Sequence, residues 1–183
     1  MNEKDKKRIS KFLSLVLRHD PEHIDLRLDK NGWAIIDELQ TKSKSRRIFF
    51  SVEELKTIVI TNDKQRFSFN EDETKIRANQ GHSVKTIDLE FEAVEPPMFL
   101  YHGTVSKFIG AIRKEGLQKR SRQHVHLSKS IDTAITVGSR RGKPLVLSVR
   151  TGDMFKKGFK FYQSKNDVWL TDRVPIEFIN FKN

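Results

Sequence analysis

The spacing of apolar and polar residues predicts helices near the start of the chain. Between residues 9 and 17, apolar side chains recur at intervals of three and four, which places them along one face of a helix. Pro21 cannot continue that helix, so we expect it to end by about Asp20. Residues 51–54 read Ser-Val-Glu-Glu, the pattern of a capping box, and predict a second helix that runs to about Ile60.

A turn, a short strand and a hairpin complete the first half of the pattern. Residues 31–32 are Asn-Gly, a turn signal, and the apolar residues of 33–39 suit a short strand followed by a helix. Phe67 and Phe69 alternate with polar neighbours and predict a strand, and a return strand is expected to carry Ile76 and Ala78. Helices followed by a β-hairpin resemble a winged helix, a module that commonly binds nucleic acid.

The second half of the chain predicts mainly β-structure with two helices. One helix is expected over residues 105–115, where Gly116 ends it, and another between the capping residue Ser130 and Gly138. Strands are expected at residues 99–102, 124–128, 145–149, 159–161, 168–170 and 176–181. The chain as a whole therefore predicts an α+β fold.

Two features divide the chain into lobes near residue 95. The adjacent prolines Pro96 and Pro97 cannot continue a helix or a central strand, so they suit a stiff linker. Residues 1–92 hold 18 Lys and Arg against 17 Asp and Glu, whereas residues 93–183 hold 17 against 7. We therefore expect lobes at residues 1–94 and 95–183, of which the second has a cationic surface that attracts nucleic acid or polyphosphates.

Composition narrows the classes of function. The chain has 183 residues and no cysteine, which excludes disulfides, thiolate metal sites and cysteine nucleophiles. The N-terminus is charged and no apolar run reaches the length of a membrane span. We expect a soluble, cytoplasmic, monomeric protein.

The first candidate site residues are Arg18 and His19, at the end of the first predicted helix, and Arg66, beside the first hairpin strand. A cation at a helix C-terminus is favoured by the helix dipole alone, and an outward Arg on a strand is usually only solvated. The alternative is that they bind a phosphate, because the planar fork of an Arg can donate two parallel hydrogen bonds to it.

A second candidate is His102-Gly103-Thr104, where we expect a strand to end at the histidine and turn through Gly103 into a helix. A glycine lets backbone N–H groups approach a ligand closely, and Thr104 could cap the helix or bind the same ligand. The tripeptide alone is a weak signal.

A third candidate is the row Arg122, His124, His126 and Ser128, which period-2 geometry places on one face of a strand. Two histidines at this spacing can chelate a metal. A catalytic zinc usually has three protein ligands, however, and no acidic residue lies close by in sequence. With Arg122 in the row, an anionic organic ligand suits the site better than a metal. Neither a Walker motif nor a Rossmann fingerprint is present.

Taken together, these motifs closely resemble the RNA 2′-phosphotransferases, the family that includes the tRNA 2′-phosphotransferase of tRNA splicing. The matching runs follow one another in the family's order over most of the chain: residues 10–19, 76–83, 100–104, 124–128 and 168–171. The resemblance implies a winged-helix RNA-binding lobe, a lobe similar to ADP-ribosyltransferases that binds NAD⁺, and an active site in the cleft between them.

The resemblance also implies a two-step reaction without a metal. The RNA 2′-phosphate attacks the anomeric carbon of the nicotinamide ribose, and the ribose 2″-hydroxyl then attacks phosphorus in the RNA-2′-phospho-ADP-ribose intermediate. The products are RNA with a 2′-hydroxyl, ADP-ribose 1″,2″-cyclic phosphate and nicotinamide.

By the same resemblance, the residues divide into two groups. The catalytic group is Arg18, His19, Arg66 and Arg122, in which either His19 or Arg122 would assist the second step. The NAD⁺-binding group is His102, Gly103, Thr104, His126, Ser128 and Val168. Protein-modifying relatives commonly carry Glu at the position of Val168, and an anionic phosphate nucleophile needs no such carboxylate.

Two alternatives remain open from the sequence. One is an ADP-ribosyltransferase that stops after the first step and caps nucleic-acid phosphate ends. The other is a non-enzymatic winged-helix regulator, which intact Arg18, His19, Arg66 and Arg122 disfavour. The physiological RNA is not indicated, and the basic tract at residues 42–47 reads equally well as an RNA contact or as a loop.

Overall fold

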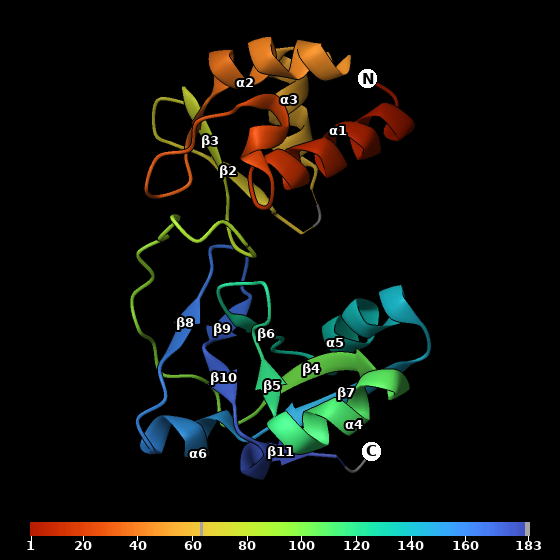
Figure 1. Ribbon diagram of the computed structural model, residues 1–183, viewed down its shortest axis with the longest axis vertical. Helices are drawn as coiled ribbons and strands as arrows, with labels where there is room; N and C mark the ends of the chain where they lie inside the picture. The colour runs from red at the N-terminus through yellow and green to blue at the C-terminus, as the bar shows by residue number, and fades with distance from the viewer. Residues whose placement is uncertain (63, 182–183) are drawn as a thin grey trace. The chain divides into compact units, whose positions relative to one another are not determined.

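A computed structural model describes residues 1–62 and 64–181 (Figure 1). The chain divides into two compact units, Met1–Glu90 and Phe91–Asn183, so that Pro96 and Pro97 lie within the second unit. The described residues mix helix and sheet, as the α+β prediction requires. None of their helices is long and apolar enough to cross a bilayer.

The described residues of unit 1 form three α-helices and a three-stranded antiparallel sheet of order β1-β3-β2. Its elements, with 3-10 helices labelled η, are α1 (Glu3–Val16), η1 (Pro21–Ile24), β1 (Ala34–Ile35), α2 (Ile36–Ser43), η2 (Lys44–Arg46), α3 (Val52–Ile60), β2 (Phe67–Phe69) and β3 (Lys75–Ala78).

The helices of unit 1 begin where capping side chains satisfy backbone N–H groups. The side chain of Asn2 accepts a hydrogen bond from the N–H of Asp5 at 2.8 Å and starts α1. The capping box predicted for α3 is confirmed, because Ser51 and Glu54 each accept from the other's backbone N–H, at 3.1 and 3.0 Å. The buried face of α1 carries Ile9 and Leu13, as its periodicity predicted.

The predicted hairpin is also confirmed. Phe67 pairs with Ala78, and Ile76 pairs with both Phe69 and Ala34, which places these side chains on the face of the sheet that packs on the helices. Arg77 points to the opposite face, where its guanidinium lies 4.5 Å from the ring centre of Trp33.

The segment 79–90, which we call the strap, contains no helix or strand and yet buries four residues, of which the first is Asn79. His82 is 0% exposed, and Ile87 and Leu89 are also buried. These three pack against the turn at Gly32, whose φ of +78° suits glycine and where a Cβ atom would lie 3.3 Å from Nε2 of His82. A hydrogen bond of 2.8 Å from the N–H of Asp88 to the carbonyl of Lys30 joins the C-terminal part of the strap to the same turn.

Between residues 91 and 181, unit 2 is built from short antiparallel strands and three α-helices. Its elements are β4 (Leu100–Val105), α4 (Ser106–Glu115), β5 (Leu117–Gln118), β6 (Val125–Leu127), α5 (Ile131–Gly138), η3 (Ser139–Arg141), β7 (Pro144–Val149), α6 (Thr151–Lys156), β8 (Phe161–Gln163), β9 (Trp169–Thr171), β10 (Arg173–Val174), η4 (Ile176–Phe178) and β11 (Ile179–Asn180).

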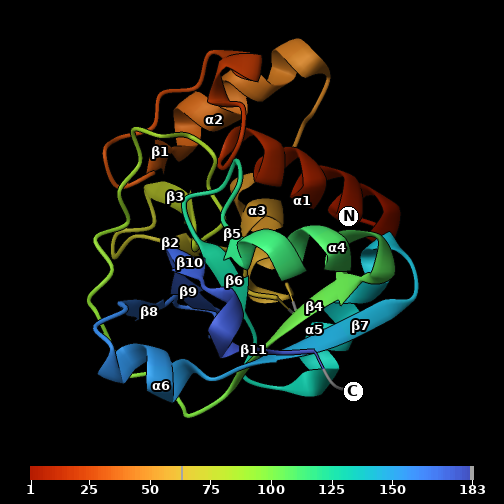
Figure 2. The same ribbon diagram turned by 60° about the horizontal axis from the view of Figure 1, so that its bottom comes forward.

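Two three-stranded sheets enclose the core of unit 2. One sheet has the order β11-β7-β4 and the other β6-β9-β8, and β10 pairs separately with β5. Leu100 and Leu147 of the first sheet belong to one apolar cluster with Leu127 and Trp169 of the second. Helices α4 and α5 lie on opposite sides of the β4–β7 pair (Figure 2).

Three expectations for unit 2 need correction. β4 does not end at His102 but continues through Gly103 and Thr104 to Val105, because all six of its residues pair with β7. The expected strand–turn–helix at His102 is therefore wrong. Residues 176–181 form mainly the 3-10 helix η4, with only two strand residues after it. The strands expected at residues 159–161 and 168–170 each lie slightly later in the chain.

Gly103 is required by packing between β4 and α5. A Cβ atom at this position would lie 1.8 Å from the carbonyl oxygen of Ala134 and 2.9 Å from the backbone nitrogen of Gly138. Backbone atoms of a helix cannot move aside as a side chain can, so even a methyl group would displace α5.

We therefore predict that Gly103→Ala lowers the free energy of unfolding by about 3 kcal/mol or more. The matched control is Gly110→Ala on α4, where a Cβ atom would meet nothing within 4 Å. Because alanine favours helix, the control should be stabilised by up to about 1 kcal/mol. Urea denaturation of both variants measures the difference, and equal stabilities would contradict the packing role of Gly103.

Candidate active site

The turn that follows α1 carries Arg18 and His19. The backbone N–H groups of His19 and Asp20 both donate to the carbonyl of Leu15, at 2.9 Å each, and close the end of the helix. Asp20 then caps η1, in which Pro21 is the first residue. The chain therefore turns sharply at this point, and both side chains project from a fixed end of the helix.

Arg66 lies close to Arg18, although 48 positions separate them in the sequence. The guanidinium of Arg18 donates to the carbonyl oxygen of Arg66 at 3.2 Å and lies 5.8 Å from the ring centre of Phe67. Arg66 in turn donates to the side-chain oxygen of Asn62 at 3.3 Å. Unit 1 thus brings together three of the four residues predicted to be catalytic.

Ser83 of the strap holds both members of the Arg18–His19 pair. Its backbone N–H donates to the carbonyl of Arg18 at 2.9 Å, and its hydroxyl lies 3.0 Å from Nδ1 of His19. With Nδ1 engaged, the imidazole plane is fixed and Nε2 is the nitrogen directed away from Ser83. Ser83 therefore acts as a positioning residue for this group.

His82 anchors the strap beneath this pair. Burial lowers the pKa of His82 to about 4, and the positive charges of Arg18, His19 and Arg77 act in the same direction. Neither ring nitrogen of His82 forms a hydrogen bond of normal geometry with a residue that the structure describes. The nearby backbone of Leu17 raises the pKa of the ring, but burial lowers it by more. The ring is therefore neutral at pH 7.

Sequence reasoning missed the roles of His82 and Ser83. The run 76–83 contributes to the family resemblance, but its last residues follow a strand and show no periodicity. The only available signal was a polar segment with one histidine directly after the hairpin. Such a segment reads as a loop, and burial of its histidine follows only from the close approach of Gly32.

In unit 2, His102 occupies the middle of β4, with its ring against β6. Its Nδ1 lies 3.1 Å from the carbonyl oxygen of His126. A carbonyl can only accept, so Nδ1 carries the proton and Nε2 of the neutral ring is an acceptor. Burial lowers the pKa of His102 and the charge of Arg122 lowers it further, while the bond to His126 opposes both. His102 can thus accept a hydrogen bond from a hydroxyl group.

His126, Ser128 and Val168 gather around the same strands. Ser128 and Tyr101 exchange backbone hydrogen bonds of 2.9 and 2.7 Å, which join β6 to β4. His126 pairs with Leu170 of β9, two residues after Val168. Val168 is half-buried, and its backbone is bound to Ser164. Unit 2 therefore brings His102, His126 and Ser128 together.

The predicted row of four polar residues on one strand face is only partly correct. β6 begins at Val125, and Arg122 lies in the turn before it, where its N–H donates to the carbonyl of Lys119 at 3.0 Å. His124 packs edge-on against Tyr162, with ring centres 5.5 Å apart, and against Phe91. Strand alternation therefore does not determine the direction of Arg122.

Gly103 and Thr104 occupy different surroundings from those expected. Thr104 is buried within β4, and Val105 rather than Thr104 precedes the first residue of α4, without a side-chain cap. The close approach of α5 is sufficient to require glycine at position 103. Their proposed contacts with NAD⁺ stay predictions, as does a single active site in a cleft between the lobes.

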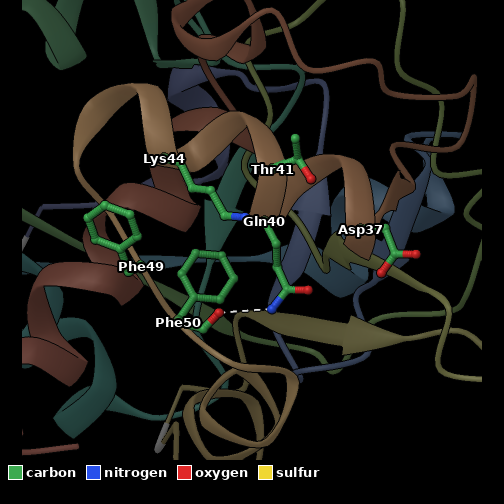
Figure 3. A pocket seen from close by; sticks show the side chains of 6 residues that line it. All are labelled: Asp37, Gln40, Thr41, Lys44, Phe49 and Phe50. Atoms are coloured by element: carbon green, nitrogen blue, oxygen red, sulfur yellow. Dashed lines mark hydrogen bonds between the residues drawn. The ribbon is translucent and has the colours of Figure 1, made fainter.

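Two other features do not coincide with these residues. A hollow of about 440 Å³ in unit 1 is lined by Asp37, Gln40, Thr41, Lys44, Phe49 and Phe50, and the amide of Gln40 donates to the carbonyl of Phe50 at 2.8 Å inside it (Figure 3). None of the candidate residues lines this hollow. We therefore place the candidate active site at Arg18, His19 and Arg66, whose side chains suit phosphate chemistry, and not at the hollow.

Within residues 1–62 and 64–181, no three His, Asp or Glu side chains converge as metal ligands would.

Comparison with known proteins identifies the family of this chain. The model of the family described as "RNA 2'-phosphotransferase, Tpt1 / KptA family" matches residues 4–173. The chain belongs to this family. A probable RNA 2′-phosphotransferase of Flavobacterium johnsoniae is 57% identical over all of both chains. One of Fusobacterium nucleatum is 54% identical over 95% of this chain and 97% of its own, and one of Pectobacterium atrosepticum is 48% identical over 93% and 95%. The protein is accordingly a transferase of the RNA 2′-phosphotransferase family.

For Ser83→Ala we predict a fall in kcat of about tenfold with little change in KM, since one hydrogen bond that orients His19 is removed. The pH profile of kcat should also shift, because Nδ1 no longer has its partner, and Ser83→Thr should restore it. Removal of phosphate from 2′-phosphorylated RNA is the measurement. Ser45→Ala, an exposed serine of the same unit, is the control. An unchanged pH profile in Ser83→Ala would show that the serine has no positioning role.

We further predict that the folded protein loses stability in acid through His82. Its folded pKa of about 4 lies below the ordinary value of 6.5, so the unfolded chain binds the proton more tightly between these values. Stability should fall by about 2 kcal/mol from pH 7 to pH 5 through this group alone. In His82→Gln this part of the pH dependence should disappear, whereas the half-buried control His23→Gln should retain it. Urea denaturation at the two pH values decides.

Proposed function

We propose that this protein removes an internal 2′-phosphate from RNA by transferring it to NAD⁺, which is consumed as a co-substrate. The products are RNA with a free 2′-hydroxyl, ADP-ribose 1″,2″-cyclic phosphate and nicotinamide. The observation that carries the proposal is that Arg18 and His19 lie beside Arg66 in unit 1 of a chain that belongs to the RNA 2′-phosphotransferase family.

The group in unit 1 suits the 2′-phosphate of RNA. Two guanidinium groups and an imidazole can donate several hydrogen bonds to a dianionic phosphate and offset its charge. Arg18 and His19 are held from both sides, by the backbone of Arg66 and by Ser83, so little reorganisation is needed when the phosphate binds. The strap therefore supports recognition of the phosphate in this proposal.

The residues of unit 2 suit the ribose of the co-substrate. The tautomer of His102 leaves Nε2 as an acceptor for a ribose hydroxyl, and its lowered pKa keeps that acceptor unprotonated at neutral pH. Val168 in place of a carboxylate avoids repulsion of an incoming phosphate. These features support NAD⁺ as the acceptor and RNA phosphate, rather than a protein side chain, as the nucleophile.

The proposed first step forms a bond between a phosphate oxygen of the RNA and the anomeric carbon of the nicotinamide ribose. The bond from that carbon to nicotinamide breaks, and its electron pair leaves with nicotinamide. Because the nucleophile is already anionic, the step needs no general base. The product of the step is RNA-2′-phospho-ADP-ribose.

In the proposed second step the ribose 2″-oxygen bonds to phosphorus, and the bond from phosphorus to the RNA 2′-oxygen breaks. The proton released by the 2″-hydroxyl is balanced by the proton taken up at the RNA 2′-oxygen. Arg122 is suited to this step because its guanidinium can stabilise charge that grows on the phosphorus oxygens. Burial lowers the pKa of Arg122 and the neighbouring Arg141 and Arg140 lower it further, yet an arginine remains protonated at neutral pH.

Incubation with NAD⁺ and a 2′-phosphorylated RNA tests the proposal. We expect nicotinamide, ADP-ribose 1″,2″-cyclic phosphate and RNA with a 2′-hydroxyl in equal amounts. Persistent phospho-ADP-ribosylated RNA would instead indicate an enzyme that caps phosphate ends. RNA binding without release of nicotinamide would indicate a regulator that lacks enzymatic activity.

In Arg122→Ala, we predict that the second step slows more than the first, by about a hundredfold. The RNA-2′-phospho-ADP-ribose intermediate should then accumulate in single-turnover reactions followed by gel electrophoresis. His102→Ala should slow the first step and leave no intermediate, which makes it the contrasting variant. Equal slowing of both steps in Arg122→Ala would refute this assignment.

A further inference from the structure

A group of cations outside the residues discussed above lies at the C-terminal end of β4. β4 and β6 run antiparallel, since Tyr101 is bridged to Ser128 and the ring of His102 meets the carbonyl of His126. The residues that precede Ser128 in β6 therefore lie beside the residues that follow Tyr101 in β4. Arg122, which precedes β6, thus belongs to the end of unit 2 at which β4 finishes.

The short helix η3 packs at the same end of β4. A Cβ atom on Gly138, directly before η3, would lie 2.9 Å from the carbonyl oxygen of Thr104, and one on Gly142, directly after η3, would lie 3.9 Å from the side chain of Val105. η3 is therefore held against the last two residues of β4. Its two arginines, Arg140 and Arg141, are exposed and lie near enough to Arg122 for their charges to act on it.

The first turn of α4 adds a further cation and an aromatic ring. Nζ of Lys107 lies 5.1 Å from the ring centre of Phe108, and the guanidinium carbon of Arg141 lies 5.7 Å from it. Attraction to the ring face holds both charges near one place on the surface. Cations from three segments thus meet at the end of β4.

These cations differ from three others in unit 2 that are paired with acidic residues. In the described part of the chain, Lys107, Arg122, Arg140 and Arg141 form no ion pair. Elsewhere in the unit, Lys119 pairs with Asp172, Arg120 with Glu115 and Arg150 with Asp153. Like charges that lie close together without counterions repel one another, and a bound anion offsets this repulsion.

We propose that Lys107, Arg140 and Arg141 form a surface that binds backbone phosphates of the RNA on the chain flanking the nucleotide that reacts near Arg122. The proposal rests on the proposed function only in taking RNA as the substrate. Lys107, Arg140 and Arg141 are three exposed charges on two segments beside Arg122, one more than the diphosphate of a dinucleotide carries. They suit phosphates that are spaced along a polynucleotide.

The test measures binding of an RNA that cannot react. A fluorescent single strand of about twelve nucleotides without a 2′-phosphate is titrated in the absence of NAD⁺, at several salt concentrations. For Arg140→Gln/Arg141→Gln we expect affinity to fall about tenfold at low salt. The slope of log Kd against log salt should decrease by about 1.4, or about 0.7 for each RNA phosphate that the surface no longer neutralises. KM for NAD⁺ should stay unchanged.

Two further variants make the result specific. Lys114→Gln/Lys156→Gln removes two exposed charges from the same unit, at the far end of α4 and on α6, and should leave RNA binding nearly unaltered. Arg140→Lys/Arg141→Lys keeps the charge and should keep most of the salt dependence.

An unchanged affinity and slope in the glutamine variant would overturn the proposal. A raised KM for NAD⁺ with normal RNA binding would also overturn it and would assign the surface to the diphosphate of the co-substrate. Because the binding assay involves no phosphate transfer, failure of the proposed reaction would not change its outcome.

Discussion

The arrangement of Arg18 and His19 depends on one buried, neutral imidazole. His82 has no exposed surface, and its ring is surrounded by three positively charged groups that oppose its protonation. The absence of a side chain at Gly32 allows the ring to lie this deep. Since Ser83 follows directly, the depth of His82 determines where the Ser83 hydroxyl and N–H meet the Arg18–His19 pair. The geometry of a charged site thus rests on a group that must stay uncharged.

Local patterns were sufficient to predict the helices and the hairpin of unit 1. Its helices have an apolar stripe and capping side chains, and its hairpin alternates apolar and polar residues. Each of these signals arises from neighbours within a few positions. The position of the strap was not predictable in this way, because its buried residues contact a turn about fifty positions earlier in the chain.

Unit 2 shows the limits of such patterns more clearly. A glycine after a histidine suggested a turn, but β4 continues because pairing with β7 and the approach of α5 outweigh the low strand propensity of Gly103. Period-2 alternation extended the row of polar residues to Arg122, although β6 is only three residues long. The residue types of the candidate site were thus evident from the sequence, whereas their directions depended on contacts between distant strands.

The tight fit of Gly103 against α5 affects how substitutions in the motif His102-Gly103-Thr104 are to be understood. A glycine beside a histidine in such a motif is readily taken for a ligand contact, and a drop in activity on its replacement would be read as support for that view. In this fold the same drop would arise from a displaced helix, even if the glycine never touched a ligand. Activity screens of cell lysates would therefore count position 103 as catalytic, and only an assay of the amount of folded enzyme would separate it from His102.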